Sequence, residues 1–136
     1  MTNDDLGVLL AGAGRRIAAE EAPILASHQL SMWEYVVLGR LFIGNARSQL
    51  TLAADIRYDK TRLIGLLDAL ERRDLIVRAP DPTDRRYRSV RLSDAGRAVL
   101  AEVRTEIHAM EVRLLDGLDG EQVELVRDTL RRLREG

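Results

Sequence analysis

The chain has 136 residues and a formal net charge of −1, and 46% of its residues are hydrophobic. This length and hydrophobic content are enough for one compact domain but not for two independent cores. It contains no cysteine, which excludes disulfide bonds, thiolate catalysis and iron–sulfur clusters. No apolar run approaches the ~20 residues of a membrane span, and the N-terminal residues lack the pattern of a signal peptide, so we expect a cytoplasmic protein.

The first two predicted elements are helices. Apolar residues recur at helical spacing from Leu6 to about Ala26, and this pattern ends in the acidic stretch near Pro23. The next helix is expected to begin after Ser31, because Ser31 and Glu34 have the spacing of a capping box, in which each side chain bonds an unpaired backbone amide of the first turn.

Two closely linked helices are predicted next. Ser48 is the expected N-cap of a short helix with the sequence QLTLAADI and is also a candidate DNA contact. Asp59 is the expected N-cap of a helix whose apolar positions continue to Leu70. Helices joined by so short a link cross at an angle, which is the helix-turn-helix arrangement. In that arrangement the second helix lies in the major groove of DNA.

Lys60, Thr61 and Arg62 form the exposed first turn of this second helix and are the candidates for base contacts. Arginine can donate two hydrogen bonds to guanine, threonine can bond a base edge or touch a thymine methyl, and lysine can reach guanine or phosphate. The same residues also fit an ordinary helix start with surface charges. Local spacing does not decide between these interpretations.

A β-ribbon is predicted after the second of these helices. Residues 75–79 and 87–92 have the Val, Ile and Tyr content of strands, and the sequence PDPTD between them has turn-forming residues. A ribbon in this place is a wing, and Arg85 and Arg86 would lie at its tip, where arginine can enter the narrow minor groove. Asp84 is the expected orienting partner, and Arg88 either contacts phosphate or faces solvent.

Basic charge is concentrated in this part of the chain. Residues 57–91 contain ten Lys and Arg against six Asp and Glu, whereas the other residues contain eleven against sixteen. Such clustering favours a nucleic-acid partner, because attraction to phosphate decays within a Debye length of ~8–10 Å. A salt-bridged, solvated face is the alternative interpretation of the charge alone.

Two more helices are predicted after the ribbon. A long one follows Ser93 with a single apolar stripe, and the last one begins with Asp119 and Gln122 in capping-box spacing. Together with the first helix they present more apolar surface than the small winged region can cover, so we expect a second copy of the chain to cover it. A symmetric dimer would present two recognition helices about 34 Å apart, which matches a pseudo-palindromic site.

Residues 54–96 resemble the signature region of the multiple-antibiotic-resistance regulator (MarR) family of bacterial winged-helix transcription factors. The family pattern is Asp-x-Arg, five residues, then Leu-Thr-x-x-Gly. The matching residues are Asp84, Arg86, Leu92, Ser93 and Gly96, with serine in place of threonine. The order of the elements matches over almost the entire chain.

The resemblance implies a mainly α (α+β) fold in a single MarR-like domain, 1–136. A winged helix-turn-helix over 31–92 would bind DNA, and the helices in 1–30 and 93–136 would form the dimer. The implied protein is a homodimeric repressor that binds double-stranded DNA without a cofactor and is released by a small aromatic or phenolic effector.

Arg57 and Asp74 depart from the family pattern, in which glycine is common at both positions. We expect a positive φ at both, which costs a non-glycine residue on the order of 1 kcal/mol. Arg57 is therefore a candidate for an additional phosphate contact.

The resemblance places the effector between the dimerisation helices and the winged region. His28 and Trp33 lie near that place in the sequence and are the candidate effector contacts. Trp33 is nevertheless more typical of a core anchor, and His28 of a partly exposed loop residue.

An enzyme is not expected. The chain offers two histidines, His28 and His108, and scattered carboxylates, which form neither a catalytic set nor a metal-ligand motif. Two functions besides an effector-controlled repressor stay open. One is a winged-helix protein-interaction module that has lost DNA binding, and the second is a DNA-binding dimer without an effector.

Overall fold

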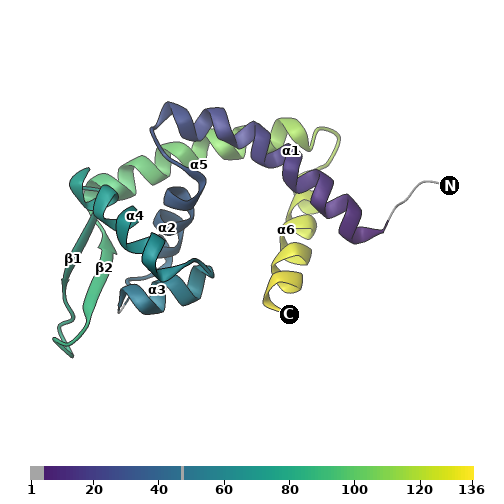
Figure 1. Ribbon diagram of the computed structural model, residues 1–136. Coiled ribbons are helices and arrows are strands. Elements are labelled where there is room, and N and C mark those ends of the chain that lie inside the picture. Colours follow the sequence, from purple (N-terminus) through teal and green to yellow (C-terminus); the bar gives the residue numbers. More distant parts are fainter. Residues whose placement is uncertain (1–4, 47) are drawn as a thin grey trace.

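The computed structural model describes residues 5–46 and 48–136. Along these residues every predicted helix and strand is present in the predicted order, which confirms the mainly α winged-helix fold (Figure 1). The elements are α1 (Leu6–Ser27), α2 (Met32–Ile43), α3 (Gln49–Ile56), α4 (Lys60–Arg72), β1 (Ile76–Pro80), β2 (Arg88–Leu92), α5 (Asp94–Leu114) and α6 (Gly120–Glu135).

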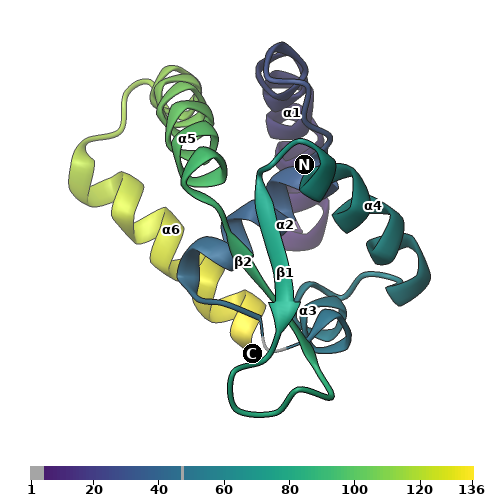
Figure 2. The same cartoon turned by 90° about the vertical axis from the view of Figure 1, so that its left-hand side faces the viewer.

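The elements are arranged in three parts. Helices α2 to α4 and the β1–β2 ribbon form one compact winged unit, α1 and α5 run side by side along one edge of it, and α6 extends from the far end of α5 (Figures 1 and 2). Among residues 5–46 and 48–136, no helix combines the length and the hydropathy of a membrane span.

Four helix starts follow the predicted caps, and the start of α5 is capped in the same way. In each of these five helices the N-cap side chain accepts a hydrogen bond from the backbone N–H three residues later, which satisfies an amide that a helix start leaves unpaired. These N-caps are Ser31, Ser48, Asp59, Ser93 and Asp119. At Ser31 and Asp119 the capping box is reciprocal, because the side chains of Glu34 and Gln122 accept from the N-cap amides.

Three helices end with a non-glycine residue in the left-handed region. The φ angles are 52° at Gln29, 54° at Arg57 and 58° at Asp74. After α3, the N–H of Arg57 donates to the carbonyl of Ala54 and the N–H of Tyr58 to that of Ala53, which is the Schellman arrangement. The positive φ expected at Arg57 and Asp74 is confirmed, and Gln29 is a third case that was not predicted.

The predicted bounds of the first helix are confirmed, and the predicted start of the first strand was one residue early. Helix α1 runs from Leu6 to Ser27, where Leu6 to about Ala26 was predicted, and it contains Pro23. The first strand begins at Ile76 instead of Leu75, because the N–H of Leu75 still closes the end of α4 by donating to Leu70.

The core of the winged unit is aliphatic and extends to α5. One face of α2, α4 and α5 and the inner side of the ribbon contribute to it. The largest fully buried side chains are Leu38, Leu41, Leu52, Leu63, Leu67, Leu70, Ile76, Leu100, Met110, Val37, Val90 and Val103. In contrast, no residue of α6 is buried.

The start of α5 is joined tightly to the end of α4. The hydroxyl of Ser93 donates to the carbonyl of Asp74 at 2.5 Å and accepts from the N–H of Gly96 at 2.9 Å. A Cβ atom on Gly96 would lie 2.0 Å from the carbonyl oxygen of Leu75, so only glycine allows this approach. Ser93 and Gly96 thus fix where the wing leaves the unit.

Candidate nucleic-acid interface

The first turn of α4 is exposed, as predicted. Lys60, Thr61 and Arg62 all face solvent, and the carboxylate of Asp59 accepts from the N–H of Arg62 at 2.8 Å. The opposite face of the helix is fixed in the core through Leu63, Leu67 and Leu70. One side of α4 is therefore anchored while its basic start remains free to enter a groove.

Of the two predicted contacts around α3, Ser48 bonds within its own helix and Arg57 lies at a cavity. The hydroxyl of Ser48 caps α3 and bonds the hydroxyl of Thr51 at 2.9 Å. Arg57 is exposed and lines a cavity of about 650 Å³ between α2, α3 and residues of α5 and α6. Arg40, Arg104 and Arg134 line the same cavity. A role of Ser48 or Arg57 at DNA stays a prediction.

The tip of the wing is held by two aspartates. Asp81 is buried, and its carboxylate accepts from the N–H and the hydroxyl of Thr83 and from the N–H of Asp84. The carboxylate of Asp84 in turn accepts from the backbone N–H, Nε and Nη2 of Arg86. The guanidinium of Arg86 is oriented by Asp84 and is still 82% exposed.

Arg85 and Arg88, the other predicted wing contacts, are also exposed. Arg85 lies in the loop beyond the strands, and Arg88 begins β2, where it pairs with Pro80 across the ribbon. The hydrogen bond from Arg86 to Asp84 raises the pKa of the Arg86 guanidinium above its usual value, which already keeps an arginine cationic at physiological pH.

Arg78 is a functional candidate that the sequence reasoning missed. It lies in the middle of β1, and its guanidinium bonds Asp68 and Glu71 of α4 at 2.5 and 2.7 Å and Gln49 of α3 at 2.8 Å. The hydrogen bond from Arg78 holds the pKa of Glu71 below its usual value. The sequence did contain a signal for this role, because Arg78 is the one charged residue in the otherwise apolar strand sequence LIVRA.

The two candidate effector residues lie apart from the cavities described here. Nε2 of His28 lies 2.5 Å from the carboxylate of Glu106, and Nδ1 lies 3.9 Å from that of Glu102. The ring of Trp33 packs on the ring of Tyr58 with the centroids 4.3 Å apart. His28 thus links the end of α1 to α5, and Trp33 links α2 to the turn after α3, and an effector role of either residue stays a prediction.

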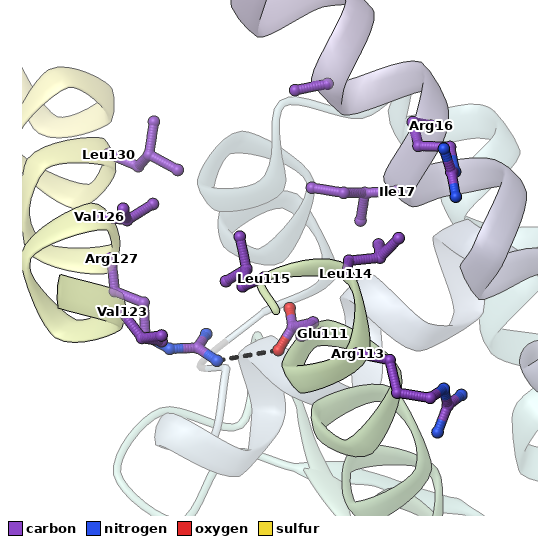
Figure 3. Close-up of a pocket in the computed structure, with 11 residues that line it drawn as sticks. Arg16, Ile17, Glu111, Arg113, Leu114, Leu115, Val123, Val126, Arg127 and Leu130 are labelled. Carbon is purple, nitrogen blue, oxygen red and sulfur yellow. Dashed lines mark hydrogen bonds and ion pairs between the residues drawn. The ribbon is translucent and has the colours of Figure 1, made fainter. Parts of the chain in front are cut away.

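An apolar cavity of about 420 Å³ opens between α1, the end of α5 and α6 (Figure 3). Its walls are aliphatic, with Ile17, Leu114, Val126 and Leu130 facing one another, and the ion pair from Arg127 to Glu111 at 2.9 Å lies at its edge. The start of α1 is also exposed and apolar, through Leu6, Val8, Leu9 and Leu10. These surfaces leave α6 and the start of α1 without cover from their own protomer.

Solved structures of related proteins show which family the chain belongs to. No model of a known protein family matches the sequence. The structure is similar to that of CouR from Rhodococcus jostii RHA1 bound to p-coumaroyl-CoA, with 30% identity, a TM-score of 0.80, and coverage of 96% of this chain and 92% of that one. CouR bound to a 23-mer DNA duplex, where it is described as a transcriptional repressor, matches at 30% identity and a TM-score of 0.80 over 96% and 93% of the chains.

A second relative carries the family name. A MarR-family transcriptional regulator from Rhodococcus sp. RHA1 is 28% identical, with a TM-score of 0.84 over 98% of this chain and 96% of that one. These likenesses extend over the winged unit and the flanking helices alike. With the fold and the exposed basic segments described above, they confirm the predicted family: the chain belongs to the MarR family of winged helix-turn-helix transcriptional regulators.

Proposed function

We propose that the protein is a repressor that binds double-stranded DNA in a sequence-specific manner as a homodimer and is released by a small aromatic or phenolic effector. The observation that carries this proposal is the presence of two exposed basic segments on one unit. The first turn of α4, with Lys60 and Arg62, is free to read a major groove, and the wing tip, with Arg85 and Arg86, is free to reach the adjacent minor groove.

We assign DNA binding and dimer formation to two different regions of one domain. The winged unit, 31–92, binds DNA, and the helices in 1–30 and 93–136 form the dimer in the cytoplasm. The exposed apolar residues of α6 and of the start of α1 support this assignment, because a second copy would cover them. Ser48, Arg57 and Arg88 are assigned to the phosphates beside the recognition helix and the wing.

The effector assignment rests on one relative and one cavity. CouR was crystallised with p-coumaroyl-CoA. In this chain the cavity between α2, α3 and residues of α5 and α6 is lined by four arginines and by one carboxylate, Asp55, which pairs with Arg40. The excess of arginine suits the negative charge of such a ligand. Trp33 lies on α2, which also lines this cavity, and His28 follows α1. An effector releases DNA when it binds more tightly to a dimer whose recognition helices are wrongly spaced.

Fluorescence anisotropy with the DNA upstream of the protein's own gene tests this function. We expect tight binding that survives random competitor DNA and weakens steeply with salt, because phosphate contacts release counterions. Lys60→Ala and Arg62→Ala should reduce binding to the operator more than binding to random DNA. Addition of p-coumaroyl-CoA to the complex tests release. A genome-wide selection of binding sites in which no site is bound more tightly than random DNA would overturn the proposal. That result would favour a protein-interaction module.

A further inference from the structure

The wing is attached to the rest of the winged unit through both of its strands, halfway along the ribbon. On one side, Ala46 forms two backbone hydrogen bonds with Val90 of β2, at 2.9 and 2.8 Å. On the other side, the side chain of Arg78 in β1 reaches α3 and α4. Because Arg78 and Val90 are partners in the ribbon register, both attachments act at the same level of the wing.

The contacts of Arg78 are those of a fixed strut. Its side chain is only 11% exposed, and Nη2 lies within 2.7 Å of both the Asp68 and the Glu71 carboxylates. Asp68 and Glu71 are three residues apart on α4, so they present two acceptors from one side of that helix. The other terminal nitrogen, Nη1, bonds the side-chain oxygen of Gln49 at the start of α3.

Arginine is the residue that this geometry requires. Its planar guanidinium carries several donors in fixed directions, so one side chain can bond two carboxylates and an amide at once, whereas a lysine ammonium is a flexible point charge. Removal of Arg78 would also leave Asp68 and Glu71 as neighbouring like charges beside the base of the wing. The strut therefore sets an angle between wing and helix instead of simply adding attraction.

We propose that Arg78 is a positioning residue for DNA binding, which holds the wing at a fixed angle to α4 so that the wing tip and the recognition helix reach one DNA site together. The proposal rests on the proposed function. Arg78 itself is too buried to touch DNA. A wing that is already oriented loses little conformational freedom when it binds DNA. The binding free energy from the contacts of Arg85 and Arg86 is therefore added in full to that from the contacts of α4.

A double-mutant cycle tests this role. In the wild type, Arg86→Ala should weaken operator binding roughly tenfold to a hundredfold. In an Arg78→Met background the same substitution should cost less than about threefold, because the wing no longer contacts DNA productively, whereas Lys60→Ala should cost as much as before. Equal effects of Arg86→Ala in both backgrounds would show that Arg78 serves only stability and would overturn the proposal.

Arg73→Met is the matched control for the cycle. Arg73 is also a partly buried arginine, and it donates to the carbonyls of Gln29 and His28 at 2.6 and 3.1 Å, so it joins the end of α4 to the end of α1 outside the wing. Its loss should leave the effect of Arg86→Ala unchanged. If Arg78→Met does not fold, Arg78→Lys keeps a cation beside Asp68 and Glu71 but loses the fixed directions of the guanidinium donors, and a loss of coupling in the same direction is expected.

A measurement without DNA separates this proposal from the proposed function. The chain has no cysteine, so spin labels can be attached at Arg85→Cys on the wing and Ile64→Cys on α4 without further changes. Double electron–electron resonance on labelled protein diluted with unlabelled protein should give a narrow distance distribution, and Arg78→Met should broaden it. Equal widths would refute the strut even if DNA binding is confirmed, and a broadened distribution would support it even if no operator is found.

Discussion

Nη2 of Arg86 lies 2.6 Å from Oδ2 of Asp84, and the backbone N–H of Arg86 donates to the same carboxylate. The two residues are separated by one position, so the Asp-x-Arg motif forms a local ring that closes within the turn. The buried carboxylate of Asp81 supports this ring from below through the N–H of Asp84. An otherwise exposed arginine is thereby presented in one orientation.

Arg86→Ala should weaken specific DNA binding by about tenfold to a hundredfold and leave the mass of the dimer unchanged. Affinity should fall because Arg86 is exposed at the wing tip, and the dimer should persist because the exposed apolar residues that we assign to it lie on α1 and α6. Anisotropy titrations and light scattering provide the two measurements. Unchanged affinity at moderate salt would contradict the wing assignment.

Gly96→Ala should lower the free energy of unfolding by roughly 3 kcal/mol or prevent folding, because the new Cβ would overlap the carbonyl oxygen of Leu75. Gly65→Ala is the control within a helix. No atom lies within 4 Å of the position of its Cβ, so we expect a gain of about 0.5–1 kcal/mol from the better helix propensity of alanine. Urea denaturation without DNA measures both, and similar effects of the two substitutions would contradict the close approach.

Arg57→Gly should separate stability from DNA binding. Glycine adopts the left-handed conformation without strain, so the free energy of unfolding should rise by about 0.5–1 kcal/mol. If Arg57 contacts phosphate, the slope of log K against log salt should fall by about one. Arg57→Ala keeps the strain and removes the guanidinium, and it should change the slope without the gain in stability. An unchanged slope in both variants would remove Arg57 from the interface.

Glu21 should make stability depend on pH. Partial burial, and to a lesser degree the charge of Glu111, raise the pKa of Glu21 above its usual value of 4.5. The carboxyl of Glu21 therefore binds its proton more tightly in the folded chain than in the unfolded chain. The free energy of unfolding falls as the pH rises from 4.5 to the raised pKa. Glu21→Gln should be more stable than the wild type at neutral pH, and the difference should vanish in acid. Thermal unfolding against pH measures it, with Glu20→Gln as the charge control.

Local chemistry explains why most of the fold was predictable. The N-caps Ser31, Ser48, Asp59 and Asp119 each bond an amide three residues away, so a short stretch of sequence contains the whole interaction. The positive φ of Gln29 was not predicted, because glutamine carries no preference for that conformation. It follows instead from the Schellman bonds at the end of α1.

The site was predictable only where its contacts are local. The pairing of Asp84 with Arg86 acts across two residues and was expected, whereas Arg78 reaches partners that are up to 29 residues away in the sequence. Such a network depends on how the wing packs against α3 and α4, which no spacing rule describes. For the same reason the sequence did not show that Arg57 faces a cavity lined by other arginines.

The bare apolar face of α6 has a consequence for how the protein behaves on dilution. No residue of this helix is buried in its own protomer, and isolated helices of about this length are marginal in water. The order of α6 is therefore linked by mass action to pairing with a second chain, so the melting temperature should rise with protein concentration. At low cellular copy number, an operator that holds two protomers together would itself favour the folding of their last helix.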